Sequence, residues 1–228
     1  MSPSSDLPFQ HFDARLTAAE ARLLSGLDSP ARIQAFLDET PYSPEHFYRC
    51  PLRVLRERKG HCFDGALFAA MALRRLGRRP LVLELVPNQR DDDHMLALIK
   101  EDGLWGAVAQ SNFSGLRYRE PVYRSLHELV MSYFEDFFNS LGEKTLRGYR
   151  GPVDLARFDR QDWMGSDEGL ESLADGLDLQ RIISILPSGA AARLTRVDER
   201  SLQAGLLGSN PAGLYEPPDD RTSGGSSS

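Results

Sequence analysis

The clearest pattern of apolar and polar positions lies in the middle of the chain. Residues 62–76 are rich in alanine and leucine and are followed by Gly77, which predicts a helix that ends there. Three apolar runs with the length of buried strands come next: residues 81–86, 94–99 and 104–110. Between the last two runs, Glu101-Asp102-Gly103 is typical of a hairpin turn. The centre is therefore predicted to be a helix followed by strands, the last two of them antiparallel neighbours.

Weaker patterns flank this centre. Apolar spacing predicts helices over residues 13–27, from Ser29 onward, over 125–138 and over 178–186, and two short strands within 145–158. The polar, Pro- and Ser-rich start and the Gly-, Pro-, Ser- and Asp-rich end bury too little apolar surface to fold. We therefore expect a flexible N-terminus over residues 1–12, a single domain over 13–204 and a disordered tail over 205–228.

Composition narrows the class of protein. Of 228 residues, 41% are apolar, which is enough for a real core, while 27 basic against 33 acidic residues give a net charge of −6. This balance does not favour nucleic acid or an anionic membrane as a partner. No apolar run approaches the ~20 residues needed to cross a bilayer, and the start lacks the features of a secretory signal. We expect a soluble, cytoplasmic protein whose oligomeric state the sequence leaves open.

Cys62 is the first candidate for chemistry, because it opens the predicted helix. Unpaired main-chain N–H groups and the positive end of the helix dipole lower the pKa of a thiol at such a position. The basic residues Arg56, Arg58 and Lys59 precede it. A free cysteine is also commonly a small buried apolar residue, as we expect for Cys50, so both interpretations of Cys62 stay open.

His94, which begins the second of the three central predicted strands, is the candidate base. A nucleophilic thiol needs an imidazole within hydrogen-bond reach, and that imidazole needs an orienting partner. The alternative is a solvated histidine beside the acidic run of residues 91–93. That run is expected to be a solvated loop, because neighbouring acids point in different directions. Neither a bound metal nor a cofactor is expected, since zinc spacing, phosphate-binding loops and nucleotide fingerprints do not appear.

The order of cysteine helix, strand, loop, histidine strand, turn and strand resembles the transglutaminase-like cysteine domains, in a small bacterial form. The matching segments are GHCFDGALFAAMALRRLG over residues 60–77 and DDDHMLALIKEDGLWGA over residues 91–107. The resemblance implies an α+β fold with a papain-like core, in which the cysteine helix packs on an antiparallel sheet behind additional N-terminal helices. It also implies that Cys62 is the nucleophile and His94 the base.

This sequence differs from the family at the third catalytic position. The family normally has an aspartate on the strand opposite the histidine, whereas residues 109–112 here are AQSN. A three-residue hairpin loop places Gln110 opposite His94, and a two-residue loop places Ser111 there. An amide orients imidazole in papain-like enzymes. Asn112 or Ser111 is therefore favoured over the longer Gln110 as the third catalytic residue.

The sequence thus predicts cysteine-dependent acyl transfer or hydrolysis on a peptide, a protein or a small amide, through a thioester. The main-chain N–H of Cys62 is expected to supply one oxyanion donor, and the second stays unassigned. The alternative is a non-catalytic domain that binds a peptide or partner protein in the cleft, which the missing aspartate supports. A third possibility is a structural or regulatory protein in which Cys62 is buried and has no catalytic role.

Overall fold

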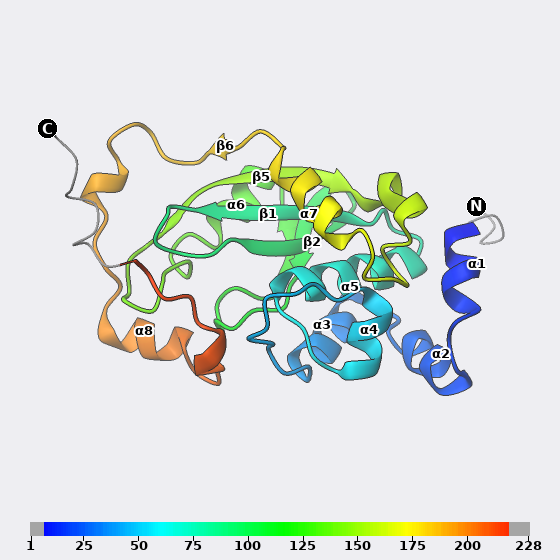
Figure 1. Ribbon diagram of the computed structural model, residues 1–228. Coiled ribbons are helices and arrows are strands. Elements are labelled where there is room, and N and C mark those ends of the chain that lie inside the picture. The colour runs from blue at the N-terminus through cyan, green and yellow to red at the C-terminus, as the bar shows by residue number, and fades with distance from the viewer. Residues whose placement is uncertain (1–6, 219–228) are drawn as a thin grey trace, which may run out of the picture.

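The computed structural model describes residues 7–218, and its centre is one antiparallel sheet (Figure 1). The strands lie in the order β4-β3-β2-β1-β5-β6, and each neighbouring pair is antiparallel. Their bounds are β1 Leu81–Pro87, β2 His94–Glu101, β3 Leu104–Val108, β4 Arg119–Tyr123, β5 Leu146–Asp154 and β6 Ile183–Ser184. The pairing of Glu101 with Leu104 shows that the β2–β3 hairpin has the two-residue loop.

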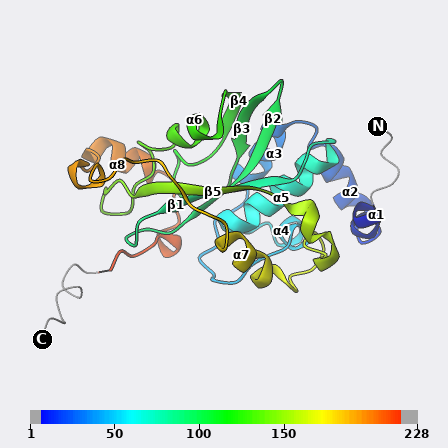
Figure 2. The same ribbon diagram turned by 90° about the horizontal axis from the view of Figure 1, so that it is seen from above.

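Two layers cover the two faces of the sheet, as Figure 2 shows from above. On one face lie the N-terminal helices, the cysteine helix and a later helix: α1 Leu7–Asp13, α2 Ala18–Ser25, α3 Pro30–Asp38, α4 Pro51–Glu57, α5 Cys62–Arg75 and α7 Leu170–Asp178. The opposite face is covered by α6 (Leu126–Met131) and the aromatic segment after it. The last helix, α8 (Glu199–Gly205), lies at the end of the molecule away from α1.

Strand β2 serves both layers, because side chains alternate across a strand. Met95, Ala97 and Ile99 belong to the core under α5, whereas Leu96 and Leu98 belong to the core under α6. The α5 helix lies close to the sheet at Gly65, where an added Cβ would come within 2.4 Å of the Cβ of Gln110. The predicted α+β fold, with a cysteine-bearing helix packed on an antiparallel sheet, is confirmed.

Several flanking elements differ from the expectation. The helix expected over 125–138 ends at Met131 and continues as turns, and the two strands expected within 145–158 are the single strand β5 followed by the 3₁₀ segment Leu155–Gln161. The helix predicted over 178–186 is wrong: α7 ends at Asp178 and β6 follows. Apolar spacing over so short a run does not separate helix from strand, and pairing with β5 decided the outcome.

The ends of the described chain are more structured than expected. Residues 7–13 form α1, whose Phe12 is fully buried in the core under α5. Residues 205–218 include the 3₁₀ segment Pro211–Gly213 and make hydrogen bonds to the body of the protein. A second 3₁₀ segment, Ala191–Arg193, precedes α8. The rest of the predicted flexible N-terminus and disordered tail, residues 1–6 and 219–228, lies outside the described residues.

Candidate active site

Cys62 occupies the first turn of α5, and a buried carboxylate fixes the start of that helix. Asp64 accepts hydrogen bonds from the main-chain N–H of His61 at 3.1 Å and of Arg49 at 2.7 Å. The Arg49 guanidinium lies 3.5 Å from the same carboxylate, and both side chains are almost fully buried. Burial raises the pKa of Asp64 to about 7, against the effect of these N–H donors and of Arg49. This arrangement holds the cysteine end of α5 in place.

The thiol of Cys62 lies against the main chain of β2. Its Sγ is 3.9 Å from the carbonyl oxygen of Asp93, the residue before His94, and the main-chain N–H of Met95 lies near enough to favour the thiolate. Tyr42 lines the same cavity as Cys62, and its phenol lies near enough to Cys62 for the two groups to interact electrostatically. Burial, and then the negative charges of Asp93 and Asp92, raise the pKa of the Cys62 thiol well above its usual range. The resting group is therefore a thiol rather than a thiolate.

The imidazole of His94 leaves β2 toward the core under α6, since His94 pairs with Leu85 of that core. Its Nε2 lies 2.7 Å from the carbonyl oxygen of Leu116. A carbonyl only accepts hydrogen bonds, so Nε2 carries the proton and Nδ1 is left as the basic nitrogen. Burial lowers the pKa of His94 to about 4, with Arg119 adding to the effect and the Leu116 bond opposing it. His94 is thus neutral at pH 7.

Two hollows meet at this end of β2. A cavity of about 250 Å³ is lined by Cys62, and a smaller one of about 50 Å³ is lined by His94. Both cavities share the lining residues Tyr42, Asp92, Asp93, Gly213 and Tyr215. The fold therefore brings Cys62 and His94 to the same end of β2, with the Cys62 Sγ beside the carbonyl of Asp93, while the His94 side chain leaves the strand on the opposite face, toward the core under α6. Direct proton transfer between their side chains stays a prediction.

The three candidates for the third position make other contacts. The Asn112 amide donates to the carbonyl of Asn210 at 2.9 Å and accepts from the N–H of Asn210 at 2.7 Å. The Ser111 hydroxyl accepts from the N–H of Phe113 at 3.0 Å, and Gln110 donates to the carbonyl of Thr40 at 2.9 Å. The hydrogen-bond partner that the structure gives the imidazole is a main-chain carbonyl, that of Leu116. Catalytic roles for Asn112 and Ser111 stay predictions.

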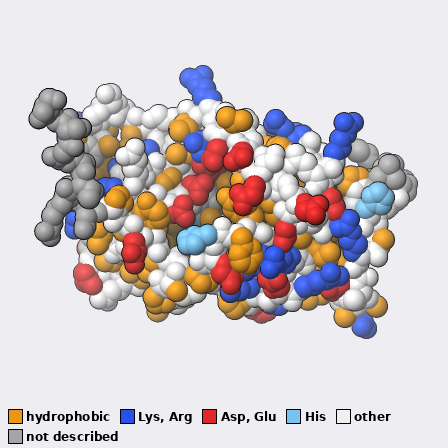
Figure 3. All heavy atoms as spheres, in the orientation of Figure 1, with side chains coloured by type: hydrophobic (Ala, Val, Ile, Leu, Met, Phe, Trp, Pro, Cys, Tyr) orange, Lys and Arg blue, Asp and Glu red, His pale blue; other side chains and the backbone are white. Residues whose placement is uncertain are grey.

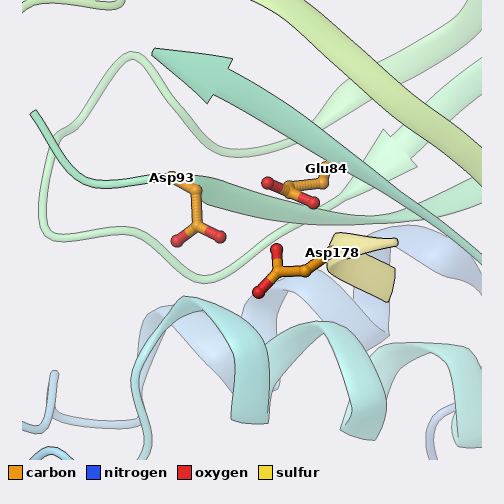
Figure 4. Close-up of side chains that lie close together, drawn as sticks. All are labelled: Glu84, Asp93 and Asp178. Atoms are coloured by element: carbon orange, nitrogen blue, oxygen red, sulfur yellow. The ribbon is translucent and has the colours of Figure 1, made fainter. Parts of the chain in front are cut away.

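The Cys62 cavity has an acidic rim. Its lining includes Glu84, Asp92, Asp93 and Asp178, and Figure 3 shows acidic side chains gathered beside a hollow in this face. Glu84, Asp93 and Asp178 point toward one another (Figure 4), with one carboxylate oxygen of each within 4.8 Å of the others. Carboxylates so arranged suit a divalent cation. A guanidinium already lies there, since Arg150 bonds to Glu84 and, at 2.9 Å, to Asp178.

The other candidates take supporting positions. His61 precedes α5 and packs edge-on to the ring of Tyr48, and burial lowers the pKa of His61 to about 4. Cys50 and Cys62 are both buried free thiols. The aromatic residues of segment 133–138 pack in the core under α6, as expected, and Phe137 and Phe138 also line the His94 cavity.

Tyr42 and Leu116 carry no signal in the sequence. Tyr42 lies in an irregular Pro-rich segment twenty residues before Cys62, and Leu116 acts through its main chain. Nothing in residue type or spacing distinguishes either from an ordinary loop residue, so only folding brings them to Cys62 and His94.

Comparisons with known proteins add a distant likeness of fold. No protein-family model matches the chain, and no curated protein matches it. Among solved structures, the EGTA-treated LapG of Legionella pneumophila is similar over 46% of this chain and 68% of that chain, with 11% identity and a TM-score of 0.33. Within residues 7–218, none of the helices has the length and apolar character that a membrane span requires.

Proposed function

We propose that the protein catalyses cysteine-dependent acyl transfer or hydrolysis of an amide, with Cys62 as nucleophile and His94 as general base. The observation that carries the proposal is that the cavities of Cys62 and His94 meet at one end of β2, where they share Tyr42, Asp92 and Asp93 as lining residues. The Leu116 carbonyl supports it further, because it holds the proton on Nε2 and leaves Nδ1 free to take one. In this proposal the main-chain carbonyl of Leu116 takes the orienting role of the aspartate that the sequence lacks.

The proposed reaction requires the His94 imidazole, which rests on the α6 side of β2, to reach Cys62. The proton of Cys62 then passes to Nδ1 of His94 as the sulfur attacks the amide carbonyl carbon. Collapse of the tetrahedral intermediate breaks the C–N bond, and the imidazolium returns the proton to the leaving amine. The acyl group stays on the sulfur as a thioester. Attack by water completes a hydrolysis, and attack by a second amine completes a transfer. Because the resting thiol and imidazole are both neutral, the thiolate forms during the attack.

Two donors near Cys62 suit the oxyanion of that intermediate. The first is the main-chain N–H of Cys62 at the start of α5, and the second is the phenol of Tyr42, which lies against it. Donors fixed in a site of low water content stabilise a developing negative charge. Both groups lie at the same cavity, so a carbonyl oxygen bound beside Cys62 is expected to meet both donors.

The acidic side chains that line the Cys62 cavity indicate the charge of the substrate. No lysine or arginine lines the Cys62 cavity within the described residues, while several carboxylates do. Such a rim attracts cationic substrates and repels anionic ones, which disfavours nucleic acid. We propose a peptide, a protein segment or a small amide that is neutral or positively charged next to the reacting carbonyl.

A binding module without catalysis is the alternative, and one contact favours it. Asn112, at the family's third catalytic position, uses both ends of its amide to hold the main chain of Asn210. This is how an amide recognises a peptide backbone, and it engages Asn112 with Asn210 rather than with His94. Under this alternative the cleft binds a peptide but does not catalyse a reaction on it.

The rate at which Cys62 reacts with an electrophile separates the two functions. Wild type, His94→Ala and Cys50→Ser are treated with iodoacetamide, and modification of each cysteine is followed by peptide mass spectrometry across pH. If His94 is the base, His94→Ala slows Cys62 by about 10²-fold or more, while Cys50→Ser leaves its rate unchanged. Hydrolysis and amine transfer are then measured on a library of peptide amides.

A rate for Cys62 that is the same with and without the imidazole overturns the catalytic proposal. Binding of the same peptide amides without turnover then supports the binding module. A circular dichroism spectrum and an unfolding midpoint for each variant show whether a slow rate reflects a lost base or a lost fold.

A further inference from the structure

The segment after α8 returns to the candidate active site. In Figure 1 it runs from α8 back toward the loop that precedes α4. Residues 212–215 of this segment line the Cys62 cavity, and Gly213 and Tyr215 also line the His94 cavity. The segment therefore lies at both hollows of the site, although it is more than a hundred residues away from Cys62 and His94 in sequence.

Side-chain amides hold the start of this segment through its main chain. Asn112 bonds to the N–H and to the carbonyl of Asn210, at 2.7 and 2.9 Å. The Asn210 amide in turn donates to the carbonyl of Tyr42 at 3.0 Å and accepts from the N–H of Ala212 at 3.2 Å. A bidentate bond from a buried side chain to the N–H and the C=O of one residue recognises backbone rather than sequence, so this contact suits any extended peptide.

Gly213 lets the segment lie directly on the ring of Tyr42. A Cβ added at Gly213 would come within 2.9 Å of Cδ1 of Tyr42 and within 3.4 Å of Nδ2 of Asn112. Atoms of an aromatic ring cannot yield as the end of a flexible side chain can. A side chain at position 213 therefore has to push the segment away from Tyr42, the residue whose phenol lies near Cys62.

Contacts beyond the site hold the segment's far end. The Ser140 hydroxyl lies 3.5 Å from the carbonyl of Tyr215, and the Arg90 guanidinium donates to the carbonyl of Pro218 at 2.9 Å. The segment is thus tied on both sides of the cavity. With it in place, Cys62 is only 8% exposed.

We infer that residues 209–215 are an intramolecular peptide ligand of the cleft that shields Cys62, held by a main-chain recognition site formed by Asn112 and Tyr42. When the segment leaves, the same site takes the backbone of an extended peptide. That second role rests on the proposed function, because the entering peptide is the acyl substrate. The shielding itself depends only on where the segment lies.

The test displaces the segment in the full-length chain. Gly213→Val places a branched side chain against Tyr42, and Asn210→Ala removes the bond to the Tyr42 carbonyl. Gly208→Asn is the matched control: it changes a glycine just before the segment that faces open space, and asparagine tolerates its positive φ of 75°. Iodoacetamide modification of Cys62 is measured by mass spectrometry, with Cys50 in the same chain as internal reference.

If the segment shields Cys62, we expect Gly213→Val to raise the modification rate of Cys62 by about tenfold and Asn210→Ala by about threefold, by favouring the open form. The rate at Gly208→Asn stays within about twofold of wild type, and so does the rate of Cys50 throughout. Hydrogen exchange of the peptide that spans residues 209–218 increases in the first two variants, which shows that the segment has been displaced.

An unchanged Cys62 rate in a variant whose segment exchanges faster overturns the inference, as does a segment that already exchanges at the rate of an unfolded chain in wild type. His94→Ala combined with Gly213→Val separates this inference from the proposed function. If His94→Ala does not slow the modification of Cys62 but Gly213→Val still speeds it, the catalytic proposal is contradicted and the shielding is not. If His94→Ala slows the modification but Gly213→Val does not speed it, the shielding is contradicted and the catalytic proposal is not.

Discussion

The two cysteines stand at the starts of consecutive helices, and the comparison between them shows what makes one of them a candidate nucleophile. Cys50 directly precedes α4, and Cys62 opens α5. Both are buried free thiols, and burial raises the pKa of Cys50 to about 12 and that of Cys62 further. At each helix start a carboxylate accepts a main-chain N–H: Asp167 from Cys50 at 2.8 Å, and Asp64 from His61 at 3.1 Å.

The surroundings of the two thiols differ. Cys50 packs within the core under α5, and its nearest charged groups, Asp167 and Arg53, bond to each other at 2.6 Å. Cys62 instead lines a cavity, touches the main chain beside His94 and meets the phenol of Tyr42. A helix N-terminus alone therefore does not distinguish a nucleophile. The strand and loop that the fold places against the thiol make the difference.

The largest difference between the two helix starts should be the loss of stability when the carboxylate at each start is removed. Asp64→Ala removes a fully buried acceptor and leaves Arg49 and two N–H groups without it, which should lower the free energy of unfolding by about 3–5 kcal/mol. Asp167→Ala, whose carboxylate is 34% exposed, should cost only about 1 kcal/mol. Urea unfolding of both variants at pH 7 measures the difference, and equal losses would show that the two starts are alike.

The second effect depends on the imidazole of His94, the residue that follows the Asp93 carbonyl against which Cys62 lies. With a pKa of about 4 in the folded protein and 6.5 as its ordinary value, His94 binds more protons when unfolded between these values. Its contribution to stability is therefore complete above about pH 6.5 and is lost as the pH falls through 4. Relative to His94→Gln, wild type should lose about 3 kcal/mol between pH 7 and pH 4.

Urea unfolding of wild type and His94→Gln at both pH values gives this difference. Subtracting the two proteins removes the opposing contribution of buried carboxyls such as Asp64 and Asp91, whose pKa burial raises to about 7 and about 6. A difference that does not change with pH would mean that the imidazole is solvated in the folded protein.

The third effect concerns how closely α5 approaches the sheet. Gly65→Ala puts a Cβ 2.4 Å from the Cβ of Gln110, which cannot move without the backbone, and should destabilise the protein by about 2 kcal/mol despite the better helix propensity of alanine. Gly176→Ala in α7 is the matched control. Its Cβ meets Phe158 at an ordinary 3.5 Å, so a gain of up to about 1 kcal/mol is expected. Thermal unfolding compares them, and a gain at both positions would contradict the close approach.

The smallest effect should come from the phenol beside Cys62. Tyr42→Phe removes a hydroxyl from the cavity that Cys62 lines, where it can donate to a forming thiolate, and should slow iodoacetamide modification of Cys62 by about threefold, while Cys50 is unaffected. The ratio of the two modification rates within one chain is the measurement, which cancels differences in reagent and fold. An unchanged ratio would make Tyr42 a packing residue only.

The central elements were predictable because their signal is local. Residues 62–76 form α5 nearly as predicted, and β1, β2 and β3 each begin at the predicted residue. Of the two hairpin loops that the sequence allowed, the two-residue loop exists, with Glu101 opposite Leu104, although the strand pairing ends at Ala97 and Val108, before His94 and Ser111. Helix 178–186 failed because its few apolar residues fit either period, and contact with β5 was not visible in the sequence.

By itself, the sequence determined that a thiol begins a helix and that an imidazole begins a strand two elements later. These follow from side-chain periodicity and turn residues, which act over a few positions. Only the tertiary structure decided what lies against them: the Leu116 carbonyl on the imidazole, the Tyr42 phenol on the thiol, and residues 209–215 across the cleft. Main-chain groups and distant loops carry no residue-type signal, so their positions arise only when the two faces of the sheet are packed.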